Sequence, residues 1–292
     1  MIRIGIVGYG NLGRACEGLL KSRPEFQHVA TFSRRHISNT ISLEKINEYK
    51  DKVDVLLVCV GSATDTPRLV PKLLESFNTV DSYDVHGDKM KEHLENADSI
   101  AKRSGTIAIV GTGWDPGVFS MMRIYMESFF NIDVQTFWGP GVSLGHTNAI
   151  RGIDGVENAI QLTIPLPKKN KHKRMCYIVS KKSERSRIVE TIVNMPKYFK
   201  GQYITIRFVS RKKFNSKFIN RTEHGGVVVA KDSQSSAMFK LKLKSNSHFT
   251  ACTMLSYAIA AYKLKQENQN GAFTVADIAP SYLSLNSVID KI

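Results

Sequence analysis

A glycine-rich turn after the first apolar run most constrains how this chain can fold. Residues 2–7 read as a strand, Gly8-Tyr9-Gly10-Asn11-Leu12-Gly13 follows, and residues 11–22 have helical spacing of apolar side chains. In this context the first glycine permits a tight turn. The second lets backbone approach a pyrophosphate, and the third lets the helix pack on the strand. The motif predicts a dinucleotide site, the alternative being a tight turn without a ligand.

The first 110 residues alternate between short apolar runs and helical segments. Further strands are expected at 28–33, 54–60, 79–83 and 106–110. Residues 55–60 are apolar throughout, which a sheet covered on both faces requires. The pattern predicts an α/β fold with a Rossmann-type, doubly wound parallel sheet.

Beyond residue 113 the pattern changes to that of a second, α+β domain. Strands are expected at 134–138, 175–180, 202–209, 226–230 and 238–244, and a helix at 250–266. At 292 residues the chain is long for one domain and short for three. We predict a dinucleotide-binding domain of residues 1–113, completed by 250–292, and a second domain of residues 114–249.

Composition excludes several classes of protein. The chain is 42% hydrophobic and 23% charged, as globular proteins are. No apolar run approaches the roughly 18 residues of a spanning helix, and the N-terminus lacks the regions of a signal peptide. The four cysteines are too scattered for a CxxC pair or a disulfide framework. We expect a cytoplasmic protein without membrane contact, its cysteines serving as small core residues.

Positive charge is concentrated in residues 168–221. This segment holds 17 of the 41 Lys and Arg residues and only two acids, Glu184 and Glu190. Such a segment forms a solvated face, a site for small anions or a nucleic-acid surface. It lacks interleaved stacking aromatics and carries no helix-turn-helix or zinc signature, so no nucleic-acid partner is expected. Residues 168–174 are expected to form a loop.

The end of the second predicted strand indicates which dinucleotide binds. An acid at this point would bind a ribose hydroxyl of NAD, but the chain has Ser33-Arg34-Arg35. A hydroxyl and two guanidiniums can bind a 2′-phosphate, so NADP is predicted. The alternative is that the two arginines are solvent-exposed residues of a loop without a ligand. The segment Gly61-Ser62-Ala63-Thr64-Asp65 is expected to lie against the nicotinamide half. Ser82 and Tyr83 complete the predicted cofactor contacts.

Two strands of the predicted sheet end in acids, Asp84 and Asp115. Ligands of open parallel sheets gather at the carboxyl ends of the strands, so both acids can converge beside the nicotinamide. Two carboxylates would bind a substrate ammonium, and their mutual repulsion would raise one pKa toward a value useful for accepting a proton. Alternatively, Asp115 caps a helix beginning at Pro116, and the two roles are compatible. No histidine has a spacing partner that indicates a metal, and none is predicted.

The chain resembles the meso-diaminopimelate D-dehydrogenases, a family of NADP-dependent amino acid dehydrogenases, from the first strand to the C-terminal tail. Three motifs in this order are the most specific: Thr112-Gly113-Trp114-Asp115-Pro116-Gly117, Thr136-Phe137-Trp138-Gly139-Pro140-Gly141 and His172-Lys173-Arg174. The resemblance implies reversible oxidation of the D-centre of meso-2,6-diaminopimelate to L-2-amino-6-oxopimelate and ammonia, with formation of NADPH. It also leads us to expect that the second domain binds substrate and forms a homodimer.

The resemblance implies roles for individual residues. Acids matching Asp84 and Asp115 bind the reacting D-amino group, and tryptophans matching Trp114 and Trp138 line the cavity. The remote L-amino acid end is held by residues matching Thr163, Arg174, His224 and Asn246. Where some members carry a polar side chain, this chain has Leu144, although the backbone N–H groups of Leu144 and Gly145 can still bind a carboxylate. Tolerance for other D-amino acids stays open, as does which acid or water removes the proton.

Other interpretations remain at this stage. Without the resemblance, Arg174 is one more solvated residue of the basic segment and His224 is a turn residue before two glycines. A different NADP oxidoreductase, acting on another D-amino acid or a sugar, would have the same first domain. A nucleotide-sensing regulator would bind nucleic acid through residues 168–221.

Overall fold

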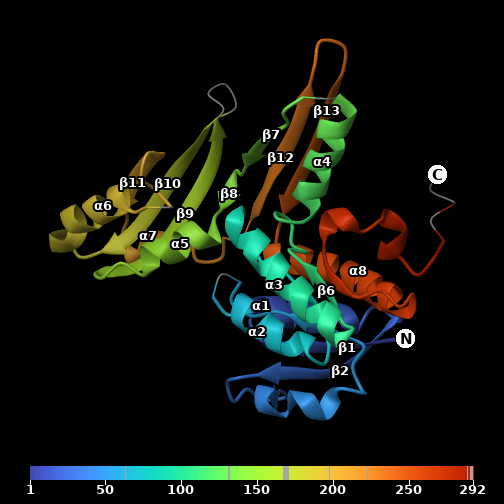
Figure 1. The fold of residues 1–292 in the computed structure, drawn as a ribbon. Coiled ribbons are helices and arrows are strands. Elements are labelled where there is room, and N and C mark those ends of the chain that lie inside the picture. The colour runs from blue at the N-terminus through green and yellow to red at the C-terminus, as the bar shows by residue number, and fades with distance from the viewer. Residues whose placement is uncertain are drawn as a thin grey trace. The chain divides into compact units, whose positions relative to one another are not determined.

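The computed structural model describes residues 1–62, 64–130, 132–166, 171–196, 198–221, 223–287, 289 and 292, with only the backbone of Leu144. Its contacts divide the chain into two units (Figure 1). The first consists of Met1–Ile124 and Ser247–Ile292, and the second of Tyr125–Asn246. Among the described residues, no helix combines the length and the apolar character needed to cross a membrane.

The first unit contains a seven-stranded sheet in which every pairing is parallel. The strands follow the order β14 (Gly271–Thr274), β6 (Ile107–Val110), β5 (Asn78–Asp81), β4 (Val55–Val58), β1 (Ile2–Val7), β2 (Phe26–Ser33) and β3 (Ile41–Ser42). Chain order reverses at β1, which pairs with β2 on one side and β4 on the other. This topology confirms the predicted doubly wound α/β fold and places a ligand crevice at the carboxyl ends of β1 and its neighbours.

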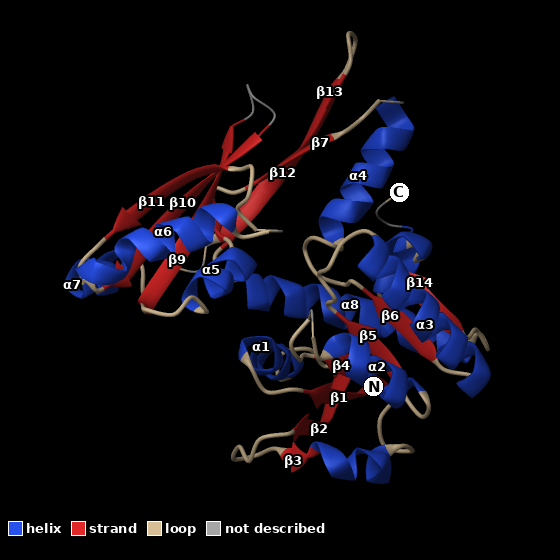
Figure 2. Cartoon of the chain, turned by 60° about the vertical axis from the view of Figure 1, so that its left-hand side comes forward, coloured by secondary structure: helices blue, strands red, loops and turns tan. Residues whose placement is uncertain are grey.

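Helices cover both faces of this sheet (Figure 2). Leu57 of β4 packs in a cluster with α1 (Asn11–Leu20) and α8 (Asn246–Gln266). Leu56 points the other way, into a cluster with α2 (Thr66–Leu74), α3 (Asp88–Ser104) and the 3₁₀ segment η1 (Leu43–Tyr49). Two buried faces explain why the strand sequences are apolar without alternation. The C-terminal segment adds both α8 and the edge strand β14, which is followed by η4 (Val275–Asp277) and η5 (Pro280–Leu283).

The second unit contains two smaller sheets. One has the order β11 (Tyr203–Phe208), β10 (Lys171–Ser180), β9 (Val156–Leu166) and β8 (Gly141–Val142), and the other β13 (Ser236–Leu243), β12 (His224–Lys231) and β7 (Gln135–Trp138). Only the pairing of β10 with β11 is parallel. The described helical segments here are α5 (Leu144–Arg151), η3 (Lys182–Glu184), α6 (Arg185–Asn194) and α7 (Arg211–Lys217), while α4 (Val118–Phe130) begins in the first unit.

Several local features were not predicted or differ from the sequence-based alternatives. Strand β9 was not predicted, because its buried centre includes the polar Gln161 and Thr163 and so lacks an apolar pattern. Residues 171–174 are not loop but the start of β10, paired with β9, whereas 168–170 lie outside the described residues. Helix α4 begins at Val118 rather than at Pro116. All four cysteines are free, and Cys16, Cys59 and Cys176 are buried as expected of small core residues.

Candidate functional site

The glycine turn between β1 and α1 has a geometry that fits a pyrophosphate. Gly8 has a φ of +101°, in the region that favours glycine, and its N–H donates to the carbonyl of Phe32. A Cβ on Gly13 would lie 2.0 Å from the Gly8 carbonyl oxygen, whereas one on Gly10 would meet nothing within 4 Å. The helix is therefore pressed against the turn at Gly13, and the turn is open at Gly10. Helix α1 starts there without an acidic residue in its first turn, as an anion site requires.

The remaining residues of the turn are placed as follows. The Tyr9 hydroxyl donates to Glu17 of α1 at 2.7 Å. Asn11 is exposed, and Leu12 packs against the core cluster that contains α1. The motif therefore has separate parts: Tyr9 and Leu12 fix the turn to the domain, and Gly10 and Asn11 face outward.

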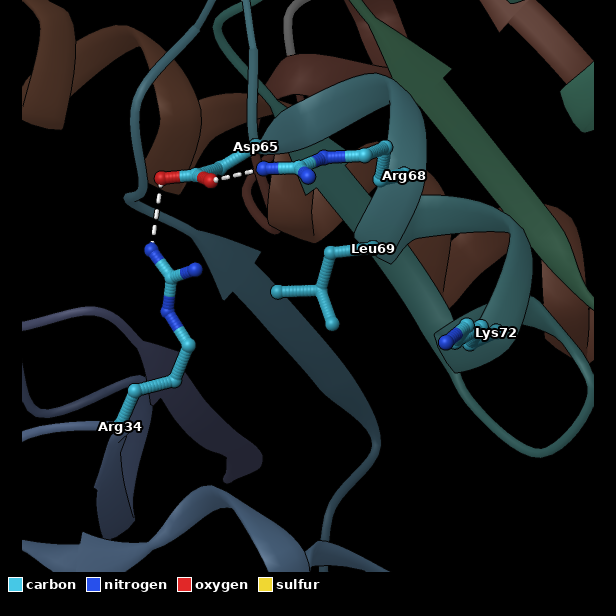
Figure 3. Close-up of a pocket in the computed structure, with 5 residues that line it drawn as sticks. All are labelled: Arg34, Asp65, Arg68, Leu69 and Lys72. Atoms are coloured by element: carbon cyan, nitrogen blue, oxygen red, sulfur yellow. Dashed lines mark hydrogen bonds and ion pairs between the residues drawn. The ribbon is translucent and has the colours of Figure 1, made fainter.

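Basic side chains gather where β2 ends (Figure 3). Arg34 forms an ion pair with Asp65 at 2.7 Å, and Arg68 of α2 contacts the other carboxylate oxygen at 3.0 Å. Together with Leu69 and Lys72 they line a pocket of about 210 Å³. The Arg34 guanidinium, above all, holds the pKa of Asp65 below its usual range. These residues fit an anionic group, since four of the five side chains are charged and three are cations.

Ser33 and Arg35 flank Arg34 differently. The Ser33 hydroxyl is buried and accepts a hydrogen bond from the backbone N–H of Arg35 at 3.1 Å, which leaves its own proton available to a ligand. Arg35 is exposed at the start of the following loop. The segment thus offers one hydroxyl and two guanidiniums around a single turn.

The segment after β4 forms a tight turn beside β5. The Gly61 carbonyl accepts from the N–H groups of Asp65 and Thr66, and the Thr64 carbonyl accepts from Arg68. The Ser62 hydroxyl donates to the carboxylate of Asp84 and accepts from the Asp84 N–H at 2.8 Å. Ser62 therefore ties the carboxyl end of β4 to that of β5. Ala63 lies outside the described residues.

Tyr83 is packed in the interior rather than facing solvent. Its side chain is buried, and its ring centroid lies 4.5 Å from that of His93 on α3. Burial raises the pKa of the phenol, so Tyr83 stays protonated. Ser82, half-buried, precedes it.

The two predicted acids follow neighbouring strands but have different surroundings. Asp84 is exposed and has the neutral Ser62 hydroxyl as a partner. The Asp115 side chain is 1% exposed and forms an ion pair with Arg123 of α4 at 2.5 Å. The pairing of Arg123 with Asp115 was not predicted from the sequence, because the position of Arg123 depends on where α4 begins. The guanidinium offsets the Asp115 charge, so mutual repulsion of the acids is not the main electrostatic effect on Asp115.

Thr163 and Arg174 lie directly opposite each other on β9 and β10. The Arg174 Nη1 donates to the Thr163 hydroxyl at 2.7 Å, and its Nε donates to the side-chain carbonyl of Gln202 at 2.6 Å. Thr163 is buried. Burial lowers the pKa of Arg174, although an arginine remains charged at neutral pH. Arg174 is thus a fixed, partly desolvated cation and not one more solvated residue of the basic segment.

His172 joins Trp138 to this group. The Trp138 N–H donates to His172 Nε2 at 2.9 Å, and the two rings lie 5.2 Å apart. Burial and the nearby Arg174 charge lower the pKa of His172, so it stays a neutral acceptor. Sequence reasoning gave His172 no role. The available signal was its position two residues before Arg174, on the same face of a strand.

His224 opens β12, two residues before the glycine that pairs with Trp138. Its Nδ1 accepts from the Gly225 N–H at 2.8 Å. Asn246 is the first residue of α8. Leu144 and Gly145 lie in the first turn of α5, where backbone N–H groups have no intrahelical acceptor; the Leu144 side chain is not described.

Trp114 precedes Asp115 in the first unit. It is 7% exposed and packs edge-on against Phe119 of α4, with ring centroids 5.1 Å apart. This contact fixes the turn that carries Asp115. In the parts of the chain that the structure describes, no group of three His, Cys, Asp or Glu side chains is arranged to hold a metal ion.

Comparison with known proteins relates the chain to one family over its full length. The family model described as diaminopimelic acid dehydrogenase C-terminal domain matches residues 113–169 and 166–247. Meso-diaminopimelate D-dehydrogenase of Corynebacterium glutamicum is 38% identical over 100% of this chain and 98% of its own length. The enzyme of Lysinibacillus sphaericus is also 38% identical, over 98% and 96% respectively.

Solved structures give the same result. The C. glutamicum diaminopimelate dehydrogenase in complex with diaminopimelate matches with a TM-score of 0.92 and 37% identity, over 99% of this chain and 97% of that one. An engineered D-amino acid dehydrogenase bound to NADP+ matches with a TM-score of 0.87 and 36% identity, over 99% and 98%. With this identity over nearly the whole of both chains, the chain belongs to the meso-diaminopimelate D-dehydrogenase family.

Proposed function

We propose that this protein is an NADP-dependent dehydrogenase that oxidises the D-centre of meso-2,6-diaminopimelate to L-2-amino-6-oxopimelate and ammonia, reversibly. The observation that carries the proposal is the relatedness to enzymes of this name over the full length of both chains. The first unit binds the dinucleotide, through the glycine turn and the basic pocket at the end of β2. When bound, NADP supplies the hydride acceptor.

We assign the D-amino end of the substrate to the acids that follow β5 and β6. Asp115, ion-paired with Arg123, accepts a hydrogen bond from the substrate ammonium. Asp84 is the exposed acid, and its described side-chain partner is the neutral Ser62. Hydride cannot leave a carbon whose nitrogen is still an ammonium, so one proton must first be removed. We assign this step to Asp84, which can pass the proton to solvent.

The oxidised carbon and its nitrogen then form an imine, and water adds to that carbon. Collapse of the adduct releases ammonia and leaves the keto group of L-2-amino-6-oxopimelate. Trp114 and Trp138 are assigned to substrate contacts, as the family resemblance implies, where large apolar side chains exclude bulk water.

The L-amino acid end of the substrate is assigned to residues of the second unit. Arg174, fixed by Thr163 and Gln202, binds the remote carboxylate, aided by His224, Asn246 and the backbone N–H groups of Leu144 and Gly145. A rigid cation far from the reacting carbon determines which end of the substrate is oxidised.

A homodimer, a cytoplasmic location and the absence of nucleic-acid binding stay predictions. The edge strand β13 exposes Met238, whose side chain is 66% exposed, and this supports the second unit as the dimer-forming one. Light scattering on the purified chain tests the dimer.

The function is tested by following NADPH formation with the stereoisomers of diaminopimelate. We expect turnover with the meso form and much slower turnover with the L,L and D,D forms. Equal rates with all three, or no turnover with the meso form, would overturn the proposal. Turnover of a sugar or a simple D-amino acid at higher kcat/KM would favour a different NADP oxidoreductase.

A further inference from the structure

Arg68, on the first turn of α2, lines the basic pocket at the end of β2 but has no individual role in the assignments above. Its Nη2 lies 3.0 Å from a carboxylate oxygen of Asp65, and its Nε donates to the Thr64 carbonyl at 3.0 Å. Although the side chain is 74% exposed, these two contacts fix its guanidinium at the rim of the pocket at the end of β2.

Asp65 is held between two guanidiniums that come from different elements (Figure 3). Arg34 reaches it from the end of β2, and Arg68 from α2. A lone carboxylate at this position would repel a phosphate. With both arginines bound, the three side chains together carry one positive charge, and Lys72 on the same pocket wall adds another.

We propose that Arg68 is a second cationic determinant of the preference for NADP over NAD and that it binds the 2′-phosphate together with Arg34, across Asp65. The inference rests on the proposed NADP binding. Each guanidinium has five N–H donors, and the described contacts of Arg34 use one and those of Arg68 two. The remaining donors suit the phosphate oxygens. Leu69, on the same wall, provides an apolar surface for the adenine ring.

The test is the affinity of the full chain for NADP and NAD, measured by calorimetry without substrate. In Arg68→Gln, the phosphate loses the N–H donors of Arg68, and the Asp65 charge is offset by one guanidinium instead of two. The Kd for NADP should therefore rise by about tenfold or more. Kd for NAD, which has no 2′-phosphate, should stay within about twofold. Arg68→Lys keeps the charge but lacks the paired N–H donors of a guanidinium. Its Kd for NADP should lie between those of the wild type and Arg68→Gln.

Arg103→Gln is the matched control, because it removes another exposed arginine of the same unit, at the end of α3 and outside the pocket. It should leave both affinities unchanged. In Arg68→Gln, the affinity for the fragment 2′,5′-ADP should fall as it does for NADP, whereas the affinity for 5′-AMP should not change.

Two outcomes would overturn the inference: an unchanged Kd for NADP in Arg68→Gln, or equal losses for NADP and NAD, which would indicate contact with the adenine or the pyrophosphate instead. Since these measurements contain no amino acid substrate, they are independent of turnover. Lack of activity with meso-diaminopimelate would defeat the proposed function and leave the assignment of Arg68 intact.

Discussion

The Asp81 carboxylate lies 2.9 Å from Nε2 of His93, and both side chains are almost fully buried. Its other oxygen accepts from the N–H groups of Tyr83 and Gly111. One buried carboxylate thus joins the ends of β5 and β6, the two strands that precede Asp84 and Asp115, to helix α3.

Asp81→Ala removes the acceptor of three buried donors at once. We expect a loss of unfolding free energy of about 3 kcal/mol or more, since each unsatisfied buried donor is costly. Asp81→Asn keeps an acceptor for the two N–H groups and should lose less. Urea denaturation measures both, and a loss in Asp81→Ala no greater than that of an exposed control, Asp88→Ala, would contradict this account.

The strands of the first unit were predictable because the signal is local. Residues 2–7 are rich in Ile and Val and residues 55–58 are all apolar, regardless of what lies beside them, and the glycine motif fixes the turn after the first strand. The missed features depend on partners distant in sequence. Strand β9 carries buried polar residues, such as Thr163, which accepts from Arg174 on the neighbouring strand.

The residues of the candidate site also differ in whether the sequence alone could identify them. Ser33, Arg34 and the acids at strand ends could be found because they follow recognisable strands. Arg123 and Arg68 could not, because their roles follow from the exact start of a helix and from which side chain it faces.

Asp84→Asn tests the assignment of the proton acceptor. The amide cannot take up a proton, so kcat should fall by about 100-fold or more. The side chain is exposed, so stability should change by less than about 0.5 kcal/mol. Steady-state kinetics and thermal unfolding measure the two effects. If Asp84→Asn retains most of its kcat, the proton leaves by another route.

Arg174→Gln tests the remote clamp. We expect KM for meso-diaminopimelate to rise by about tenfold or more and KM for NADP to change by less than about twofold, because the lost contact is a charge-assisted hydrogen bond to the substrate. The neighbouring Lys173→Gln is the matched control, since successive strand residues point to opposite faces. If both variants behaved alike, the basic segment would act only through its total charge.

His146 makes stability depend on pH. Its ring contacts Ser143 and the Tyr198 carbonyl, and burial together with the Arg174 charge lowers its pKa from 6.5 to about 4. The unfolded chain therefore binds a proton between these values that the folded chain does not, so stability is lost as pH falls from 6.5 toward 4.

After allowance for partial exposure, the contribution is roughly 2 kcal/mol. Unfolding free energies at pH 7 and pH 4 should show that the advantage of the wild type over His146→Asn shrinks by this amount. The exposed His36→Asn provides the control. A constant difference between wild type and His146→Asn would show that the imidazole is solvated.

Two glycines of α1 give opposite expectations for the same substitution. At Gly13 a methyl group would lie 2.0 Å from the Gly8 carbonyl, so Gly13→Ala must push the helix away from the turn. We expect a loss of about 1–3 kcal/mol in stability and weaker binding of both NADP and NAD, since the shared pyrophosphate site is distorted. Gly18, exposed on the same helix, has nothing within 4 Å of such a methyl group, and Gly18→Ala should stabilise by about 0.5–1 kcal/mol through helix propensity. Denaturation and calorimetry on the pair separate the close approach at the turn from the general effect of alanine in a helix, and full NADP affinity in Gly13→Ala would mean that the turn does not hold the pyrophosphate.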